Sequence, residues 1–173
     1  MYKNFILESR NFLTTKECKY LIKEYKKISK PSKEKGHGYN YVDLEGKPAF
    51  NKLAVLMLPV LTEYKKKYPE VDLTKNKWAL TNMRFKHFKP GKLFEKFHSE
   101  HSYEHATRLL NIQIYLSDHN CGTKFYNNKI IKSEEGKIVV FPSYFTHTHK
   151  GQKCPDKKNR YIITGYINFL DLI

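Results

Sequence analysis

Side chains that commonly bind metal ions are concentrated in one short stretch of the sequence, FEKFHSEHSYEH. His98 and Glu100 form a His-x-Glu pair, and His101, Glu104 and His105 follow directly. In an extended strand, residues i and i+2 project from the same face, so His98 and Glu100 can reach one ion together. We expect the later three side chains to lie on an exposed link toward the next strand. The pair therefore predicts a metal centre that needs a further ligand.

A second pair of histidines, His147 and His149, lies in the segment FPSYFTHTHKG. The segment is several strand-and-turn units of roughly 8–12 residues downstream of Glu100, so the chain can return on a facing strand. Both histidines share one face if the segment is extended, so the alternation of side chains along a strand does not distinguish them, and either could be the third ligand. Two histidines and one carboxylate on one face, with other positions open, are typical of non-haem Fe(II) sites.

A basic residue begins another strand-like run, RYIITGYINF. Arg160 shares a face there with Ile162 and Thr164. Burying a guanidinium among such residues costs free energy unless it meets an anion. A carboxylate held by two parallel hydrogen bonds would offset that cost. We therefore expect Arg160 to bind an anionic ligand; an exposed arginine at the start of a strand is the alternative.

The run RLLNIQIYLSD also has two different faces. Its leucines and isoleucines alternate with Asn111, Gln113 and Tyr115. One face therefore suits the core, and the other suits a polar cavity or solvent. Of the three polar side chains, Tyr115 is the strongest candidate for binding a ligand.

Two amphipathic segments in the first part of the chain are predicted to be helical. FLTTKECKYLIKEYKKIS starts with Thr14 and Glu17 at capping-box spacing, and its apolar residues recur with the helical period. NKLAVLMLPVLTEYKKKYP has a similar pattern, but Pro59 predicts a kink or a restart. Between them, KPSKEKGHGYNYVDLEGKP is rich in Gly, Pro and Lys and predicts a loop, which could cover a substrate.

From Trp78 onward, short β-branched and aromatic runs are separated by turn signals such as Pro-Gly, Cys-Gly and Glu-Gly. They predict about eight strands. Helices followed by such strands favour an α+β fold with a jelly-roll, cupin-like double-stranded β-helix core. We expect one domain over residues 1–173, with supporting helices in 1–75 and the β-helix in 76–173.

The composition limits the classes of partner and compartment. The chain carries a formal net charge of +15 and three cysteines without a CxxC pair. The charge allows a nucleic acid or ribonucleoprotein partner, although dispersed lysines are more often solvated surface. Widely spaced cysteines predict free thiols in a reducing compartment, and hence a cytoplasmic protein. No apolar run is long enough to span a membrane, and no secretion signal is predicted.

Several of these segments occur together in a known family. FKPGKLFEKFHSE, IYLSD with CGTKF, GKIVVFPSYFTHTHKG and RYIITGYINF follow the order seen in prolyl-4-hydroxylase-like oxygenases that depend on 2-oxoglutarate and Fe(II). The resemblance covers residues 78–169, and FLTTKECKYLI resembles the short helix that opens these domains.

The resemblance implies roles for individual residues. His98, Glu100 and one late histidine would hold Fe(II), and Arg160 would bind the distal carboxylate of 2-oxoglutarate with Tyr115 donating a hydrogen bond to it. The offset from FPS favours His147, whereas the shorter gap to Arg160 favours His149, which we take as the third ligand. The implied reaction uses dioxygen, with ascorbate as a further candidate cofactor. It hydroxylates a C–H bond and releases succinate and CO2; a peptidyl residue such as proline is the expected substrate.

The sequence departs from the family pattern at three places. Glu100 stands where many relatives have Asp, so the ligand has a longer reach. Cys121, in CGTKF, replaces the first glycine of the commoner Gly-Gly-x-x-Phe turn. Phe88 stands where relatives often have a tyrosine that contacts the co-substrate.

Two other functions fit parts of the sequence. HSYEH, from His101 to His105, matches the inverted zinc-protease motif; on a helix both histidines could share a zinc ion, with Glu104 as the base. The positive charge would also suit a non-catalytic β-barrel that binds nucleic acid. Neither alternative accounts for Arg160 beside a His-x-Glu pair.

Overall fold

The computed structural model describes residues 3–33, 37–73 and 75–170. Two α-helices, three short 3-10 helices and ten strands follow one another along this part of the chain. The elements, in order, are β1 (Leu7–Ser9), α1 (Thr15–Lys26), β2 (Lys30–Pro31), β3 (Asn40–Asp43), α2 (Pro48–Lys67), η1 (Pro69–Asp72), β4 (Trp78–Phe88), η2 (Tyr103–His105), β5 (Arg108–Tyr115), β6 (Gly122–Phe125), β7 (Ile130–Lys132), β8 (Ile138–Pro142), η3 (Phe145–His147), β9 (His149–Gly151) and β10 (Arg160–Phe169).

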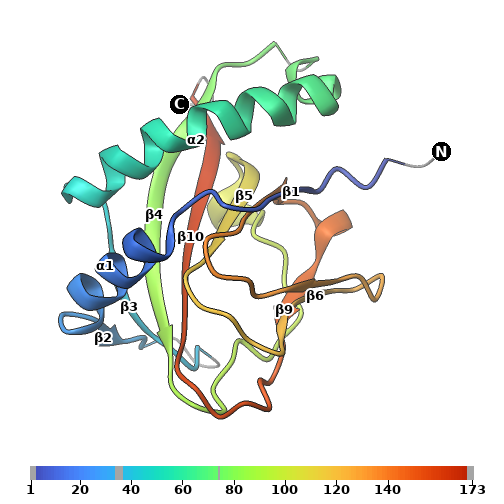
Figure 1. Cartoon of the computed structure of the whole chain (residues 1–173). Helices are drawn as coiled ribbons and strands as arrows, with labels where there is room; N and C mark the ends of the chain where they lie inside the picture. Colours follow the sequence, from blue (N-terminus) through green and yellow to red (C-terminus); the bar gives the residue numbers. More distant parts are fainter. Residues whose placement is uncertain (1–2, 34–36, 74, 171–173) are drawn as a thin grey trace.

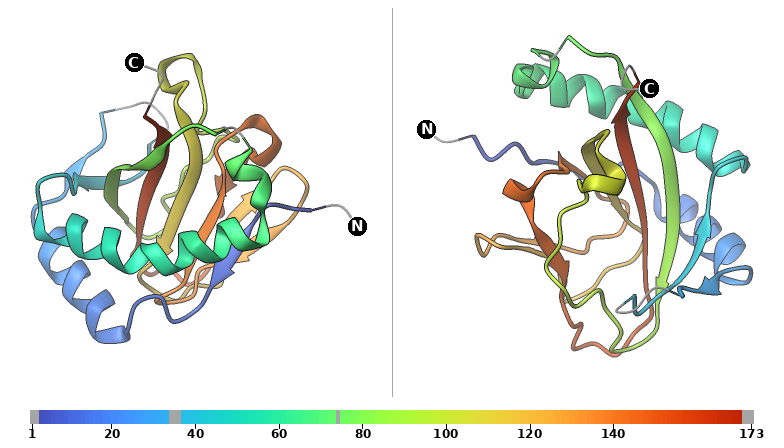
Figure 2. Two further views of the ribbon diagram at one scale, coloured as in Figure 1. Left: turned by 90° about the horizontal axis from the view of Figure 1, so that it is seen from above. Right: turned by 180° about the vertical axis from the view of Figure 1, so that it is seen from behind.

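The strands form two antiparallel sheets. The larger has the order β1-β8-β5-β10-β4-β3-β2, and the smaller has the order β7-β6-β9. Figure 1 shows both helices on one side of the large sheet and the small sheet on its other side, and Figure 2 shows the same layers from above and behind. This is the double-stranded β-helix with supporting helices that the sequence predicts.

Each face of the large sheet has its own apolar cluster. On the helical side, Leu53 and Met57 of α2 pack in one core with Phe85 and Ile163. On the other side, Phe125 of β6 packs with large-sheet residues that include Phe141. The cavity that carries the candidate site lies on this second side, between the sheets.

The first helix forms as the sequence predicts. The Thr14 side chain accepts a hydrogen bond from the Glu17 backbone N–H, and the Glu17 carboxylate accepts one from the Thr14 backbone N–H. This capping box satisfies two donors that the helix leaves unpaired. Cys18, Leu21 and Tyr25 then face the core.

The predicted restart of the helix at Pro59 is wrong, because α2 is one helix from Pro48 to Lys67 with Pro59 inside it, whereas the alternative, a kink, stays a prediction. Pro59 lies on the exposed face, as does Val55, whose carbonyl loses its helical partner there. Water can bind that carbonyl, while the opposite face of α2 is buried against the sheet. Burial of the apolar stripe therefore outweighs the local cost of the proline.

Part of the predicted loop before α2 is a strand. Residues 40–43 form β3, which pairs with β4, and Tyr39, Val42 and Leu44 are buried. A short strand with Asn, Tyr and Asp is recognised by its pairing rather than by its own residue pattern. The remainder of that predicted loop includes residues 34–36, which lie outside the described residues.

The prediction of three free thiols is also wrong. Cys121, immediately before β6, and Cys154, in the β9–β10 connection, form a disulfide with a Cα–Cα distance of 5.0 Å. Cys18 is free and buried. The two cysteines are 33 residues apart. They meet only because β6 pairs with β9, a contact that their spacing does not reveal.

In the described ranges, no helix is both long and apolar enough to cross a membrane.

Candidate metal centre

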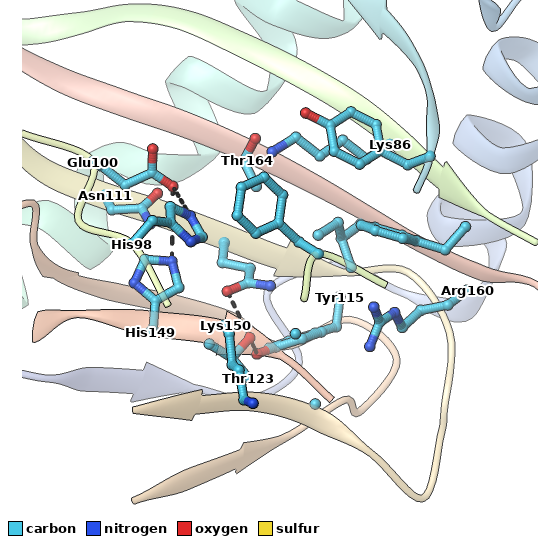
Figure 3. Close-up of a pocket in the computed structure, with 17 residues that line it drawn as sticks. Lys86, His98, Glu100, Asn111, Tyr115, Thr123, His149, Lys150, Arg160 and Thr164 are labelled. Carbon is cyan, nitrogen blue, oxygen red and sulfur yellow. Dashed lines mark hydrogen bonds and ion pairs between the residues drawn. The ribbon is translucent and has the colours of Figure 1, made fainter. Parts of the chain in front are cut away.

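Three side chains from two distant parts of the chain meet in the space between the sheets. His98 Nε2 lies 3.3 Å from Glu100 Oε1, and His149 Nε2 lies 3.7 Å from the same oxygen. The ligand atoms of all three lie within 4.8 Å of one another, so one ion could contact each. Figure 3 shows the three side chains converging at one end of a pocket.

Backbone pairing places these ligands. His98 and His149 form an isolated antiparallel bridge, with His98 N donating to His149 O (3.0 Å) and His149 N donating to His98 O (2.9 Å). Glu100 N donates to Ser143 O at 3.0 Å. These backbone hydrogen bonds hold the His-x-Glu segment against the segment that carries His149, so residues far apart in the sequence share one site.

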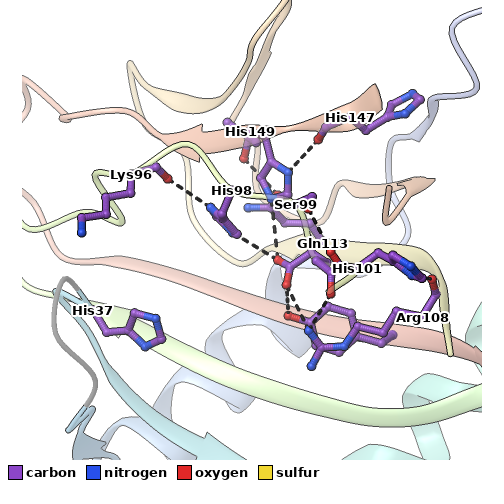
Figure 4. Close-up of polar contacts among 12 residues, drawn as sticks. His37, Lys96, His98, Ser99, His101, Arg108, Gln113, His147 and His149 are labelled. Carbon is purple, nitrogen blue, oxygen red and sulfur yellow. Dashed lines mark hydrogen bonds and ion pairs between the residues drawn. The ribbon is translucent and has the colours of Figure 1, made fainter. Parts of the chain in front are cut away.

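The two histidines are oriented through their other ring nitrogens. His98 Nδ1 lies 3.1 Å from Lys96 O, and His149 Nδ1 lies 3.0 Å from His147 O. A carbonyl oxygen only accepts, so each Nδ1 carries a hydrogen, and in the neutral form of the ring the Nε2 lone pair faces Glu100. Holding the remote N–H in this way fixes the ring for metal binding. Figure 4 shows both contacts.

Glu100 is held by residues that the sequence analysis did not single out. The Tyr166 hydroxyl donates to Glu100 Oε2 at 2.8 Å, and Arg108 Nη1 lies 3.4 Å from the same oxygen. Arg108 also donates to the Glu100 backbone carbonyl at 3.0 Å. Oε1 is thereby left facing the two imidazoles. The alternation that puts Ile162 and Thr164 on the Arg160 face would, if continued by two residues, also include Tyr166, but nothing in the pattern indicates that Glu100 is its partner.

The site favours an ionised Glu100 carboxylate and a neutral His149 imidazole. Burial alone would raise the pKa of the Glu100 carboxyl, but the polar and cationic groups that surround it, with His98 first among them, outweigh burial and hold that pKa below its usual range. Burial, followed by the charge of His98, lowers the pKa of His149 to about 4. His149 is therefore neutral at pH 7, the form that binds metals.

His147, the alternative third ligand, lies outside this group. Its Nε2 lies 2.9 Å from Asn4 O, and its Nδ1 lies 2.9 Å from Thr146 Oγ1. Because η3 ends at His147 and β9 begins at His149, the segment is not extended through both residues. Their side chains consequently do not share a face, and only His149 approaches Glu100.

The zinc-protease motif has no supporting geometry. Residues 103–105 form a single 3-10 turn, and His101 Nδ1 lies 3.4 Å from the Arg108 carbonyl. Among the described residues, two groups of side chains could hold a metal ion, and neither contains His101, Glu104 or His105. These residues lie on the link before β5, as the sequence analysis expected.

Arg160 lies at the other end of the same pocket (Figure 3). Its side chain is buried, its guanidinium carbon lies 4.5 Å from the centre of the Phe88 ring, and its Nη1 donates to Gln152 O at 3.2 Å. Its Nε has no hydrogen-bond partner in the described structure, and burial lowers the pKa of the guanidinium. A buried cation with an unused hydrogen-bond donor favours the binding of an anion.

Polar side chains line the pocket between these two ends. The Tyr115 hydroxyl lies 2.8 Å from Thr123 Oγ1, which donates to Gln113 Oε1 at 2.9 Å. Burial raises the pKa of Tyr115, so its hydroxyl keeps its hydrogen. Asn111 Oδ1 and Thr164 Oγ1 are buried without a partner among the described residues. Thr123 and Thr164 are pocket residues to which the sequence analysis gave no role.

The strand register explains why this face is polar. Thr164 of β10 is opposite Gln113 of β5 and Arg84 of β4, and Ile162 is opposite Tyr115 and Lys86. Directly opposed residues point to the same side of a sheet. The polar residues of three strands thus meet in one patch, whereas the alternate residues enter the helical core.

A second hollow of about 430 Å³ reaches the metal ligands from the side of β3 and β4. His98 and Glu100 form its inner end. Arg84 and Lys86 lie along its wall, with Arg84 paired to Asp43 at 2.6 Å and stacked on Tyr41 at 4.3 Å. Lys86 Nζ lies 4.9 Å from the centre of the Tyr39 ring. Cations and aromatic rings therefore alternate along this approach.

No family model matches the sequence, and no curated protein matches it. Solved structures are similar. One is a viral collagen prolyl hydroxylase from Paramecium bursaria Chlorella virus-1 in complex with 2-oxoglutarate, with a TM-score of 0.71 at 16% sequence identity. The match covers 96% of this chain and 97% of the viral chain. A Pseudomonas putida prolyl-4-hydroxylase has a TM-score of 0.74 at 14% identity, covering 97% and 94%.

A Trichoplax adhaerens prolyl hydroxylase, in complex with a peptide fragment of a hypoxia inducible factor, has a TM-score of 0.67 at 14% identity. It covers 96% of this chain and 84% of its own. At such identities the comparisons establish the fold. The chain has the double-stranded β-helix architecture of prolyl hydroxylases over nearly its whole length.

Proposed function

We propose that this chain is a 2-oxoglutarate- and Fe(II)-dependent dioxygenase that hydroxylates a C–H bond of a peptidyl residue, with proline as the first candidate. One observation carries the proposal: a His98–Glu100–His149 cluster and a buried Arg160 form the two ends of a single pocket. A metal at one end and a cation at the other complement a keto diacid, which can chelate an ion and still present a carboxylate.

The donor set fits Fe(II). Two imidazole nitrogens and one carboxylate oxygen, leaving other positions open, are the ligands of non-haem iron oxygenases. When bound, iron with 2-oxoglutarate and dioxygen would supply the oxidising chemistry, with succinate and CO2 as by-products. The protein's share is to hold three ligands, to bind the co-substrate and to keep the reacting carbon close while excluding water.

The pocket residues fit 2-oxoglutarate. The Arg160 guanidinium offers donors to a carboxylate, and Tyr115 and Thr123 provide hydroxyls on the same wall. The unpartnered Thr164 Oγ1 and Asn111 Oδ1 lie along the pocket toward the metal ligands, where a bound polar molecule would satisfy them. Phe88 has no hydroxyl to offer and instead packs its ring on the guanidinium.

The substrate would approach through the hollow on the β3–β4 side. The prolyl hydroxylase from Trichoplax was solved with a peptide, which supports an extended peptide as the substrate class. Lys86 gives the wall of the hollow a positive charge, beside an Arg84 that is already paired with Asp43, and this charge favours a peptide with an acidic side chain near the residue that reacts. Tyr39 and Phe94 would contact its apolar parts.

Succinate release tests the proposal. The protein is supplied with Fe(II), 2-oxoglutarate and ascorbate, and peptide, nucleic-acid and free amino-acid substrates are compared. We expect peptide-dependent release that is lost in Glu100→Ala and kept in Glu104→Ala, a carboxylate of the neighbouring link. If the wild type and Glu104→Ala both release no succinate, and the protein binds nucleic acid with an affinity that falls steeply with salt, the result would instead support a non-catalytic basic module.

A further inference from the structure

A second group of metal-grade side chains lies on the far side of Arg160 from the candidate iron site. His119, Cys154 and Asp156 place one ligand atom each within 4.8 Å of one another. Cys121 is joined to Cys154 by the disulfide. We propose that, once this disulfide is reduced, His119, Cys121, Cys154 and Asp156 bind one Zn²⁺ ion. This proposal is independent of the dioxygenase function.

The ligands come from two short segments that the fold brings together. HNC supplies His119 and Cys121, and CPD supplies Cys154 and Asp156, each pair separated by one residue. The first segment leads into β6, and the second lies in the β9–β10 connection. Two i, i+2 pairs on adjoining loops can surround an ion without moving the sheets.

His119 is already oriented as a ligand. Its Nε2 lies 3.0 Å from Ser117 Oγ, and its Nδ1 lies 2.8 Å from Asp156 Oδ2. Ser117 Oγ is fixed in turn, since it accepts the Tyr161 backbone N–H at 3.3 Å. A ligating histidine commonly donates its remote N–H to such a partner, which directs the other nitrogen at the metal. Without a metal, Nδ1–H of the buried His119 ring donates to Asp156, and Nε2 accepts from the Ser117 hydroxyl. Zinc would take the place of the hydrogen between Nδ1 and Asp156, and Nε2, then protonated, would donate to Ser117 Oγ.

The donor types select zinc. Two thiolates and one imidazole, completed by one carboxylate, suit tetrahedral Zn²⁺, whereas Mg²⁺ and Ca²⁺ prefer oxygen ligands alone. The neighbouring guanidinium favours the thiolates, because Arg160 Nη1 lies 3.4 Å from Cys121 Sγ and 3.7 Å from Cys154 Sγ. His119 and Asp156 border a surface hollow of about 280 Å³, through which an ion can enter.

Cys121 and Cys154 can either form the disulfide with each other or bind the metal, but not both at once. A dithiol or phosphine reductant delivers two electrons to the disulfide, breaking the S–S bond and giving two cysteine thiols while the reductant is oxidised. Zinc then binds the two thiolates, and two protons are released. Either state links the two loops that contact Arg160. Only the fully reduced, metal-free protein would lack that link.

Cobalt binding tests the proposal on the full chain. The protein is reduced with a phosphine, freed of metal and titrated with Co²⁺. The near-ultraviolet charge-transfer band of Co²⁺ requires sulfur ligands, so Co²⁺ bound to His98, Glu100 and His149 does not contribute to it. We expect the band in the reduced wild type, its removal by added Zn²⁺, and no band in the disulfide form. Cys18→Ala is the matched control and should keep the band.

Three variants make the test specific. Cys121→Ser and Cys154→Ser should each lose the band or reduce it strongly, with far-ultraviolet circular dichroism reporting that the fold is kept. Ser117→Ala retains every ligand and should weaken zinc binding by about 10–100-fold, because it frees the ring of His119. The absence of a band in the reduced wild type would overturn the proposal, as would a full band in Cys154→Ser or in the oxidised protein.

Discussion

The Tyr166 hydroxyl donates a 2.8 Å hydrogen bond to Glu100 Oε2, while Glu100 Oε1 faces both histidines of the cluster. The two carboxylate oxygens thus have separate tasks. A glutamate has one more rotatable bond than an aspartate, so it needs more support to present one oxygen to an ion. Tyr166 and Arg108 provide that support from β10 and β5.

Removing the Tyr166 hydroxyl should therefore weaken metal binding without removing a ligand. We expect Tyr166→Phe to lower Fe²⁺ affinity by about 10–100-fold, the usual effect of losing a partner that orients a ligand. Metal affinity is measured by competition with a chromophoric chelator. Tyr20→Phe, which alters an exposed tyrosine of α1, is the control. Equal affinity in both variants would mean that Glu100 holds its orientation without Tyr166.

The two late histidines should respond oppositely to substitution. His149→Ala removes an imidazole 3.7 Å from Glu100 Oε1 and should abolish stoichiometric iron binding. His147→Ala removes only a ring that contacts Asn4 O and Thr146, so iron binding should remain. Iron content per chain after reconstitution is the measurement. Equal iron retention by the two variants would discredit the His98–Glu100–His149 cluster as the metal site.

The sequence predicted those parts of the fold that leave a local pattern. The capping box at Thr14 and Glu17 is visible as residue types at fixed spacing, and the alternation in β5 and β10 separates core residues from pocket residues before any pairing is known. The His-x-Glu pair is local in the same sense. Such features depend on neighbours within a few positions.

Features that depend on pairing between distant segments were missed. The strand β3 is recognisable only beside β4, and the Cys121–Cys154 disulfide only once β6 lies beside β9. His149 was preferred to His147 only for its shorter gap to Arg160, because the separation of their faces depends on where a 3-10 turn ends, which the spacing does not reveal. Pro59 shows the converse, because burial of the opposite face of α2 overrides a correct local rule.

Arg160 should determine affinity for 2-oxoglutarate. Arg160→Lys keeps the positive charge but loses the planar fork that binds a carboxylate through two parallel hydrogen bonds. The loss of one charge-assisted hydrogen bond costs about 1.5–3 kcal/mol, so we expect the dissociation constant for 2-oxoglutarate to rise roughly 10–100-fold. Calorimetric titration of the metal-loaded protein measures it. Arg10→Lys, at an exposed position, should have no effect, and an unchanged constant in Arg160→Lys would place the diacid elsewhere.

The metal-free protein should lose stability on mild acidification. The pKa of His149 is about 4 in the folded protein against 6.5 for an unperturbed histidine. Below pH 6.5 the unfolded chain therefore binds a proton that the folded protein does not, so stability falls with pH until about pH 4. Between pH 7.5 and 5 this residue should lower the free energy of unfolding by about 2 kcal/mol.

Urea denaturation at the two pH values measures that change. In His149→Gln the pH dependence should be weaker by the same amount, because the titrating group is gone. His105→Gln, which changes an exposed histidine, should match the wild type. A His149→Gln curve parallel to the wild type would show that His149 binds its proton equally well in both states.

Lys86 should select the charge of the substrate. It lines both the pocket toward Arg160 and the hollow on the β3–β4 side, and its charge acts on Glu100 and His149. Lys86→Met keeps much of the side-chain volume and removes the cation. We expect the KM for an acidic peptide to rise about tenfold, with little change for its amide counterpart, because only the former has a charge to pair.

Lys124→Met, a substitution on β6 outside the hollow, is the matched control for Lys86→Met. Peptide-dependent succinate release gives the KM of both proteins for both peptides, and the Kd for 2-oxoglutarate reports whether the co-substrate end is disturbed. A rise in KM that is equal for the acidic peptide and its amide would assign Lys86 to the general shape of the hollow rather than to charge selection. A rise confined to the Kd for 2-oxoglutarate would move the role of Lys86 from the substrate to the co-substrate.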